Sequence, residues 1–182
     1  DLTAPRIAFH PFKGPPVVLE RWPLEVFAGW ARSLAEELGA SVIITGSPEE
    51  APFAEQLVKM AAHPRVSSLA GQTSLEELAA LAQECDLFLC PDSGPMHVAA
   101  AAGARVLGVY AMEEDFPQRW APLSCPSLIL RPQPLGCPSG CRKPTCQDYR
   151  CYQAVEIPQL LAMSRDLLSR SRPNPAPNPP GK

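Results

Sequence analysis

Two patterns of apolar residues alternate along the chain. Short apolar or β-branched runs predict strands at residues 7–9, 41–45, 66–69, 86–90 and 105–110. Segments with apolar residues every three or four positions predict helices from about residue 23, over residues 53–60, from residue 74, near residue 95 and over about residues 158–169. Strands that alternate with helices form parallel βαβ units, so we expect an α/β fold with a Rossmann-like, doubly wound parallel sheet. Ligands of such a sheet bind at the carboxyl ends of its strands.

The composition is that of one globular domain. The 182 residues are 46% apolar and 19% charged, and we expect a domain of residues 1–170 followed by a disordered, proline-rich tail of residues 171–182. The net charge is −3 and the basic residues are scattered, so neither nucleic acid nor an anionic membrane surface is an expected partner. No apolar run predicts a transmembrane segment or a signal peptide. We therefore expect a cytoplasmic protein.

Residues 90–98 (CPDSGPMHV) predict a strand that turns directly into a helix. The start of a helix has unpaired N–H groups and partial positive charge, which together make an anion site. Gly94 lets a ligand approach the backbone, and Ser93 can donate a hydrogen bond to a phosphate oxygen. Asp92 repels a diphosphate, so sugar hydroxyls are its better partners. In the structural alternative, Asp92 or Ser93 only caps the helix and His97 is an ordinary structural histidine.

Residues 92–101 (DSGPMHVAAA) resemble the Asp-Ser/Thr-Gly-x-x-His segment of glycosyltransferase family 9, the heptosyltransferases that build the inner core of lipopolysaccharide. Four more segments resemble the family in order and spacing: residues 21–27 (RWPLEVF), 44–50 (ITGSPEE), 69–78 (LAGQTSLEEL) and 120–122 (WAP). The resemblance spans about residues 6–160. It implies the C-terminal, donor-binding half of a GT-B glycosyltransferase, which has two Rossmann-like domains.

The resemblance also implies a set of residues that bind a nucleotide-sugar donor, commonly ADP-heptose in this family. Ser93, Gly94 and His97 would hold the diphosphate. Asp92 would hold the transferred sugar, and Glu50 the ribose of an ADP-sugar. The expected donor site is completed by Gly46, Met96, Lys13 and Arg21. No cofactor is implied.

Two Ser-x-x-Glu sequences predict capping boxes at helix starts. Ser74 with Glu77 is interpreted as structural only. Ser47 with Glu50 has two interpretations, a capping box or a contact with ribose, because the turn also follows the carboxyl end of a strand.

One position departs from the family pattern. Glu20 stands where the family has a phosphate-binding lysine, and a carboxylate cannot pair with a diphosphate. Lys13 and Arg21 are the candidates to supply the missing positive charge.

The resemblance further implies an N-terminal domain, absent from this sequence, with the acceptor pocket and a catalytic carboxylate. An inverting transfer needs a base for the acceptor hydroxyl and a site that stabilises the departing diphosphate. The chain supplies only the second, so we expect no catalytic residue in it and no transfer by the chain alone. With that domain, the enzyme would transfer a sugar to a lipid-linked oligosaccharide at the inner face of the cytoplasmic membrane.

Four cysteines form a C-x3-C-x4-C-x4-C pattern in residues 137–151: Cys137, Cys141, Cys146 and Cys151. Four close thiols can bind zinc, hold an iron–sulfur cluster or pair as disulfides. The spacing matches no pair of C-x2-C motifs, which disfavours a metal site. The resemblance implies a role in bracing the loop, because some family members have a similar cysteine-bearing segment. The other three cysteines lie among apolar residues and are expected in the core: Cys85, Cys90 and Cys125.

Two further classes of function stay open. Another GT-B enzyme or a nucleotide-sugar epimerase would share a phosphate site at a helix start. A noncatalytic nucleotide-binding module is the second alternative, because Glu20 weakens the donor site and the acceptor domain is absent.

Overall fold

Strands and helices alternate along the chain in the computed structural model, which describes residues 4–133 and 141–170. The strands are β1 (Arg6–Phe9), β2 (Ser41–Ile44), β3 (Val66–Ser68), β4 (Leu87–Pro91), β5 (Val106–Val109) and β6 (Ser127–Leu130). The α-helices are α1 (Leu24–Glu37), α2 (Ala51–Ala61), α3 (Leu75–Glu84), α4 (Gly94–Ala101), α5 (Pro117–Trp120) and α6 (Ile157–Ser169). Short 3-10 helices are η1 (Leu19–Arg21), η2 (Lys143–Thr145) and η3 (Arg150–Ala154).

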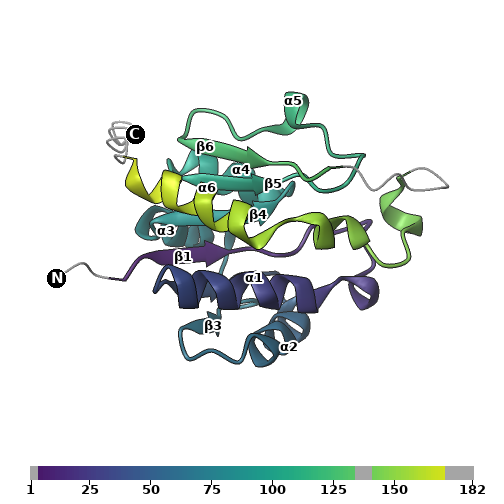
Figure 1. Cartoon of the computed structure of the whole chain (residues 1–182), viewed down its shortest axis with the longest axis horizontal. Coiled ribbons are helices and arrows are strands. Elements are labelled where there is room, and N and C mark those ends of the chain that lie inside the picture. Colours follow the sequence, from purple (N-terminus) through teal and green to yellow (C-terminus); the bar gives the residue numbers. More distant parts are fainter. Residues whose placement is uncertain (1–3, 134–140, 171–182) are drawn as a thin grey trace.

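The six strands form one parallel sheet in the order β3-β2-β1-β4-β5-β6 (Figure 1). β1 lies between β2 and β4, with Ile7 opposite Val42 on one side and Leu87 on the other. From β1 the chain adds β2 and β3 on one side, and then returns to add β4, β5 and β6 on the other side. The loops that follow β1 and β4 lead away in opposite directions, which leaves a crevice at their carboxyl ends. This confirms the doubly wound, Rossmann-like prediction.

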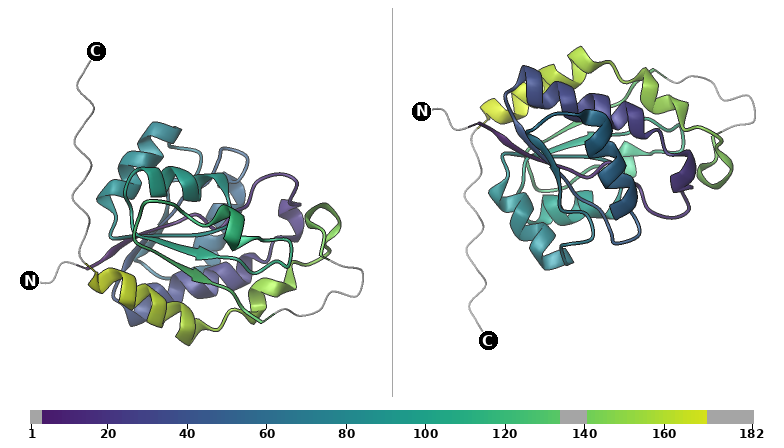
Figure 2. Two further views of the ribbon diagram at one scale, coloured as in Figure 1. Left: turned by 90° about the horizontal axis from the view of Figure 1, so that it is seen from above. Right: turned by 90° about the horizontal axis from the view of Figure 1, so that it is seen from below.

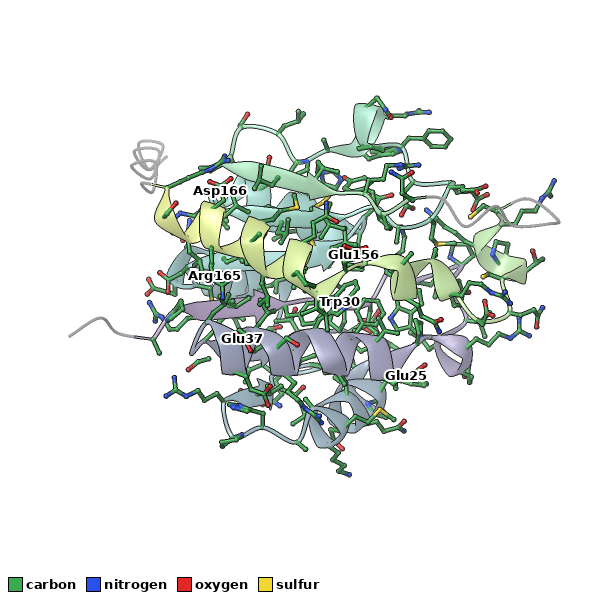
Figure 3. The ribbon with its side chains drawn as sticks, in the orientation of Figure 1. Glu25, Trp30, Glu37, Glu156, Arg165 and Asp166 are labelled. Atoms are coloured by element: carbon green, nitrogen blue, oxygen red, sulfur yellow. The ribbon has the colours of Figure 1, made fainter. Side chains whose placement is uncertain are left out.

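Helices cover both faces of the sheet (Figure 2). The larger apolar core joins the sheet to α1, α2 and α6, and a second core joins it to α3 and α4. In Figure 3, α1 and α6 lie side by side, and Arg165 of α6 donates a hydrogen bond to the carbonyl of Glu37 over 3.4 Å. β4 and β5 are buried at every position, as expected for strands of a covered parallel sheet.

A cluster of aromatic rings fills the larger core beside β1. The ring of Phe27 lies 4.8 Å from that of Trp30, 5.3 Å from that of Trp22 and 5.1 Å from that of Tyr152. Phe9 stacks on Trp30 at 6.3 Å. Aromatic pairs in this range add roughly 0.5–1.5 kcal/mol beyond the area that they bury. The cluster therefore joins β1, α1 and η3 more tightly than burial alone would.

The predicted elements are confirmed to within a few residues, but the prediction missed β6. Its sequence, Ser-Leu-Ile-Leu, is short and lies in a proline-rich stretch. The connection from β5 contains only the single turn α5, so no amphipathic helix marks a βαβ unit there. Pairing with β5, which places Ile129 opposite Gly108, makes the segment a strand.

The three cysteines expected in the core do not all lie there equally. Cys85 and Cys90 are buried, whereas Cys125 is half-buried at the edge of the smaller core. Residues 171–182, predicted to be a disordered tail, and Cys137 lie outside the described residues. Within residues 4–133 and 141–170, no helix is long and apolar enough to span a membrane.

We predict that Trp30→Ala lowers the free energy of unfolding by about 3–5 kcal/mol, because it leaves a large cavity between Phe9, Phe27 and Tyr152. Trp120→Ala is the matched control, since Trp120 is 46% exposed, and its cost should stay below about 1 kcal/mol. Urea denaturation followed by circular dichroism measures both. Equal losses for the two variants would show that the cluster contributes nothing special.

Candidate functional site

A pocket of about 530 Å³ opens at the carboxyl edge of the sheet. Its walls come from the loops after β1, β2 and β3 and from the first residues of α3 and α4. Four residues of the expected donor site line it: Lys13, Gly46, Glu50 and Gly94. The pocket thus lies at the crevice that the sheet topology predicts.

The start of α4 leaves an unsatisfied hydroxyl at the edge of the pocket. Ser93 precedes the helix with extended backbone and makes no side-chain capping hydrogen bond. Its hydroxyl oxygen is buried and has no hydrogen-bond partner among the described residues. Beside it, the Cα of Gly94 faces open space, with no heavy atom within 4 Å of where a Cβ would stand. Capping therefore does not account for Ser93, and the partial positive charge of the helix start meets an open approach.

Met96 and His97 follow in the first turn of α4 and have different surroundings. The Met96 side chain is fully buried in the smaller core, where its sulfur lies 3.5 Å from the hydroxyl oxygen of Tyr110, which donates its proton to the Trp120 carbonyl. His97 is exposed, and its ring meets the edge of Trp120 at 6.4 Å. The side chain of Met96 therefore anchors the start of α4 in the smaller core, whereas His97 is accessible to a ligand.

Four charged side chains meet beside the pocket, and we call them the charge cluster: Lys13, Asp92, Asp115 and Lys143. Lys13 Nζ lies 2.5 Å from Asp115 Oδ1 and 3.7 Å from Asp92 Oδ2. Lys143 Nζ lies 3.4 Å from Asp115 Oδ1 and 4.0 Å from Asp92 Oδ2. The loops after β1, β4 and β5 and the segment after β6 thus bring two positive and two negative charges together.

Asp115 is the centre of this cluster and is fully buried. Its second carboxylate oxygen accepts a hydrogen bond from the Met112 backbone at 3.1 Å, and its carbonyl accepts one from Arg131 at 2.7 Å. Burial lowers the pKa of Lys13, and the charge of Asp115 and the hydrogen bond to it oppose that shift. The carboxylate of Asp115 therefore offsets part of the cost of burying the Lys13 charge.

Glu50 and Ser47 exchange hydrogen bonds across the turn after β2. The Ser47 N–H donates to Glu50 Oε2 at 2.8 Å, and the Glu50 N–H donates to the Ser47 hydroxyl at 3.3 Å. These are the bonds of a capping box, although they close the turn before α2, whose N-cap is Glu50 itself. Burial raises the pKa of Glu50. Ser47 and Glu50 therefore make the reciprocal bonds that the sequence predicts, but in the turn before α2 and without Ser47 as its N-cap. Glu50 also lines the pocket.

Gly46 packs closely against this turn. A Cβ there would lie 3.2 Å from both Glu50 Oε2 and Ala70 Cβ, closer than most real Cβ contacts. At the second predicted capping box, Ser74 and Glu77 exchange both bonds and start α3. That prediction is confirmed.

Of the two candidates to replace the family lysine, only Lys13 reaches the pocket. Arg21 instead donates a hydrogen bond to the carbonyl of Cys146 at 3.3 Å, and it is absent from the pocket lining. Glu20 is exposed in η1 and also lies outside the lining. The carboxylate at position 20 therefore does not face the pocket.

His10 is a pocket residue that the sequence did not single out. It follows β1 directly, is almost fully buried, and its Nδ1 lies 3.2 Å from the Thr45 hydroxyl at the end of β2. Burial lowers the pKa of His10 to about 4, so the ring is neutral at physiological pH. Its position at the carboxyl end of a strand was the available signal.

Asp115 and Lys143 were also missed. Asp115 follows the predicted strand at residues 105–110 by five positions, in a loop without a motif. Lys143 lies between Cys141 and Cys146, in a segment whose only recognisable pattern is the spacing of its cysteines. Nothing local in the sequence shows that these two residues meet Lys13.

The segment of residues 141–154, which we call the cysteine-bearing segment, packs on the loop after β1 (Figures 1 and 2). Tyr149 is buried against Trp22 at 5.0 Å, and its hydroxyl accepts a hydrogen bond from the Val18 backbone at 2.9 Å. The described cysteines of the segment pack against the larger core: Cys141, Cys146 and Cys151. Among the described residues, no three His, Cys, Asp or Glu side chains are grouped as metal ligands.

Comparison with known proteins shows which family the chain resembles. Residues 10–147 match the model of the family described as glycosyltransferase family 9 (heptosyltransferase). The lipopolysaccharide core heptosyltransferase OpsX of Haemophilus influenzae is 37% identical over 103 residues, which are 56% of this chain and 28% of that protein. The chain thus spans well under half the length of this relative.

Solved structures share the fold. The E. coli ADP-heptose lipopolysaccharide heptosyltransferase II superposes with a TM-score of 0.71 at 24% identity, over 92% of this chain and 47% of that one. The E. coli heptosyltransferase WaaC with ADP gives 0.66 at 16% identity, over 90% and 44%. The described fold corresponds to about half of each of these two-domain GT-B structures.

We predict that Asp115→Asn lowers the free energy of unfolding by about 3 kcal/mol, because it leaves Lys13 buried without its closest counter-charge. Adding Lys13→Met should recover part of the loss, since the two effects are coupled. Asp166→Asn, which breaks an exposed pair with Arg170, is the control and should leave the urea midpoint unchanged. Full additivity in the double variant would contradict a buried ion pair.

A second prediction concerns pH. Because burial holds the pKa of folded His10 near 4, below its ordinary value of 6.5, the unfolded chain takes up a proton first as the pH falls through this window. Stability should therefore fall with pH, and between pH 7 and pH 5 the chain should lose about 2 kcal/mol more than His10→Asn does. Urea unfolding at the two pH values measures the difference. Equal losses of stability in the two proteins would show that folding does not lower the pKa of His10.

Proposed function

Because the chain belongs to glycosyltransferase family 9, the heptosyltransferases, we propose that it is the donor-binding domain of an inverting glycosyltransferase of lipopolysaccharide core biosynthesis. Its proposed donor is an ADP-heptose-like nucleotide sugar. The observation that carries this proposal is the pocket between the Glu50 turn and the start of α4, where the buried, unpartnered Ser93 hydroxyl stands beside the open face of Gly94. The family match favours a glycosyltransferase over a nucleotide-sugar epimerase.

The diphosphate is the part of the donor that fits the start of α4. Backbone N–H groups and the helix dipole favour an anion there. The Ser93 hydroxyl would gain the hydrogen-bond partner that it lacks in the structure. His97 is exposed one turn into the helix, and we expect its ring N–H to donate to the same phosphates.

The sugar and the nucleoside would then lie on either side of the diphosphate. Asp92 directly precedes Ser93, and its carboxylate suits the hydroxyls of the transferred sugar. Glu50 lines the opposite wall, where the ribose hydroxyls would meet its carboxylate. Leu75, an exposed apolar side chain in the same lining, offers a surface for the base. The E. coli heptosyltransferase WaaC, 16% identical to this chain, has been solved with ADP, which supports adenine as the base.

Transfer also needs a base and an acceptor pocket. The described fold corresponds to about half of each solved relative, so we propose that an acceptor domain supplies both, as part of an enzyme at the inner face of the cytoplasmic membrane. The acceptor would be a lipid-linked oligosaccharide. The part proposed for this chain is to orient the donor and to stabilise the departing diphosphate.

Nucleotide selectivity tests the proposal. At a hundredfold excess over its Kd, ADP should stabilise the chain by about 2.7 kcal/mol and raise the melting temperature by several degrees, whereas UDP and GDP should do so less. Gly94→Val should abolish the shift, because its side chain would project into the open approach to the helix start. Thermal shift with each nucleotide measures this.

Gly29→Val is the matched control. Gly29 lies in α1 and also has no heavy atom within 4 Å of its Cβ position. Its variant should keep the ADP shift, since it adds the same side chain away from the pocket. A chain that no nucleotide stabilises would overturn the proposed function.

A further inference from the structure

Lys143 belongs to the charge cluster beside the pocket but is not among the residues that line the pocket. Its segment is anchored by its main chain. The Lys143 N–H donates to Glu114 Oε2 at 2.9 Å, and its carbonyl accepts a hydrogen bond from the Tyr149 hydroxyl at 2.9 Å. Tyr149 is buried against Trp22 and bonded to Val18. The fold therefore holds the backbone at position 143 without using the lysine side chain.

The two lysines of the charge cluster are engaged to different degrees. The Lys13 side chain is 2% exposed and lies 2.5 Å from Asp115, so its charge is committed to a buried pair. The Lys143 side chain is 23% exposed, and its nearest carboxylate oxygen lies 3.4 Å away, longer than an ordinary charge-assisted hydrogen bond. An ammonium group has three N–H donors, so Lys143 can bind a further anion.

Lys143 also stands next to the start of α4. Its Nζ lies 4.0 Å from Asp92 Oδ2, and Asp92 directly precedes the unpartnered Ser93 hydroxyl. The charges of the cluster sum to zero, so it does not repel a diphosphate as a whole. Without Lys143 it would carry a net negative charge at the place where the phosphates would enter.

We propose that Lys143 is the member of the charge cluster that binds the phosphates of the nucleotide. Lys13 is a positioning residue that holds Asp115 in place. This inference rests on the proposed function. It assigns a ligand contact to the cysteine-bearing segment, which otherwise serves only as packing. It also explains why the structure fixes the main chain of Lys143 and leaves its side chain partly exposed.

Isothermal titration with ADP and with adenosine tests the inference, because only ADP has phosphates. Lys143→Met should weaken ADP binding by about tenfold and leave adenosine binding unchanged. Lys143→Arg should restore most of the ADP affinity, since it keeps the charge. Lys59→Met removes the same charge from an exposed position at the end of α2 and should change neither affinity.

The outcomes separate this inference from the proposed function. If the unaltered chain binds neither ligand, the proposed function fails. If it binds ADP and Lys143→Met binds ADP equally well, only the role of Lys143 is overturned. Equal loss of ADP and adenosine in Lys143→Met, or loss of its circular dichroism signal, would mark Lys143 as structural and would overturn its role as well.

Discussion

The buried ion pair between Lys13 and Asp115 joins the loop after β1 to the loop after β5, on opposite sides of β4. Neither group is stable alone in this position, because an unpaired charge in the interior costs several kcal/mol. The two loops must therefore take the conformations that bring the groups to 2.5 Å. Asp92 and Lys143 complete the charge cluster around this pair, beside the pocket.

Stability and ligand binding are connected through the same residues. The aromatic cluster around Trp22 and Phe27 holds Tyr149 and Tyr152 of the cysteine-bearing segment, and Tyr149 in turn holds the backbone of Lys143. The apolar core thus determines where one charge of the site lies. A cluster of four charges with no net charge is also less costly to bury than separate ions.

The family relationship survives low sequence identity because few positions carry the site. A doubly wound sheet places its strand ends in the same arrangement whatever residues fill its core, so structures with 16–24% identity still superpose. Two glycines have different surroundings at the site. A Cβ at Gly46 would lie 3.2 Å from the Glu50 carboxylate, whereas a Cβ at Gly94 would meet no heavy atom within 4 Å.

The sequence alone determined the parallel α/β fold, the two Ser-x-x-Glu turns and the strand-to-helix turn at Ser93 and Gly94, because each depends on local periodicity or on residues a few positions apart. It did not reveal β6, whose short apolar run becomes a strand only by pairing with β5. Only the tertiary structure decided that Lys13 rather than Arg21 reaches the pocket. It also brought Asp115 and Lys143 to the site, because charges more than 100 positions from Lys13 in the chain meet only when the sheet has folded.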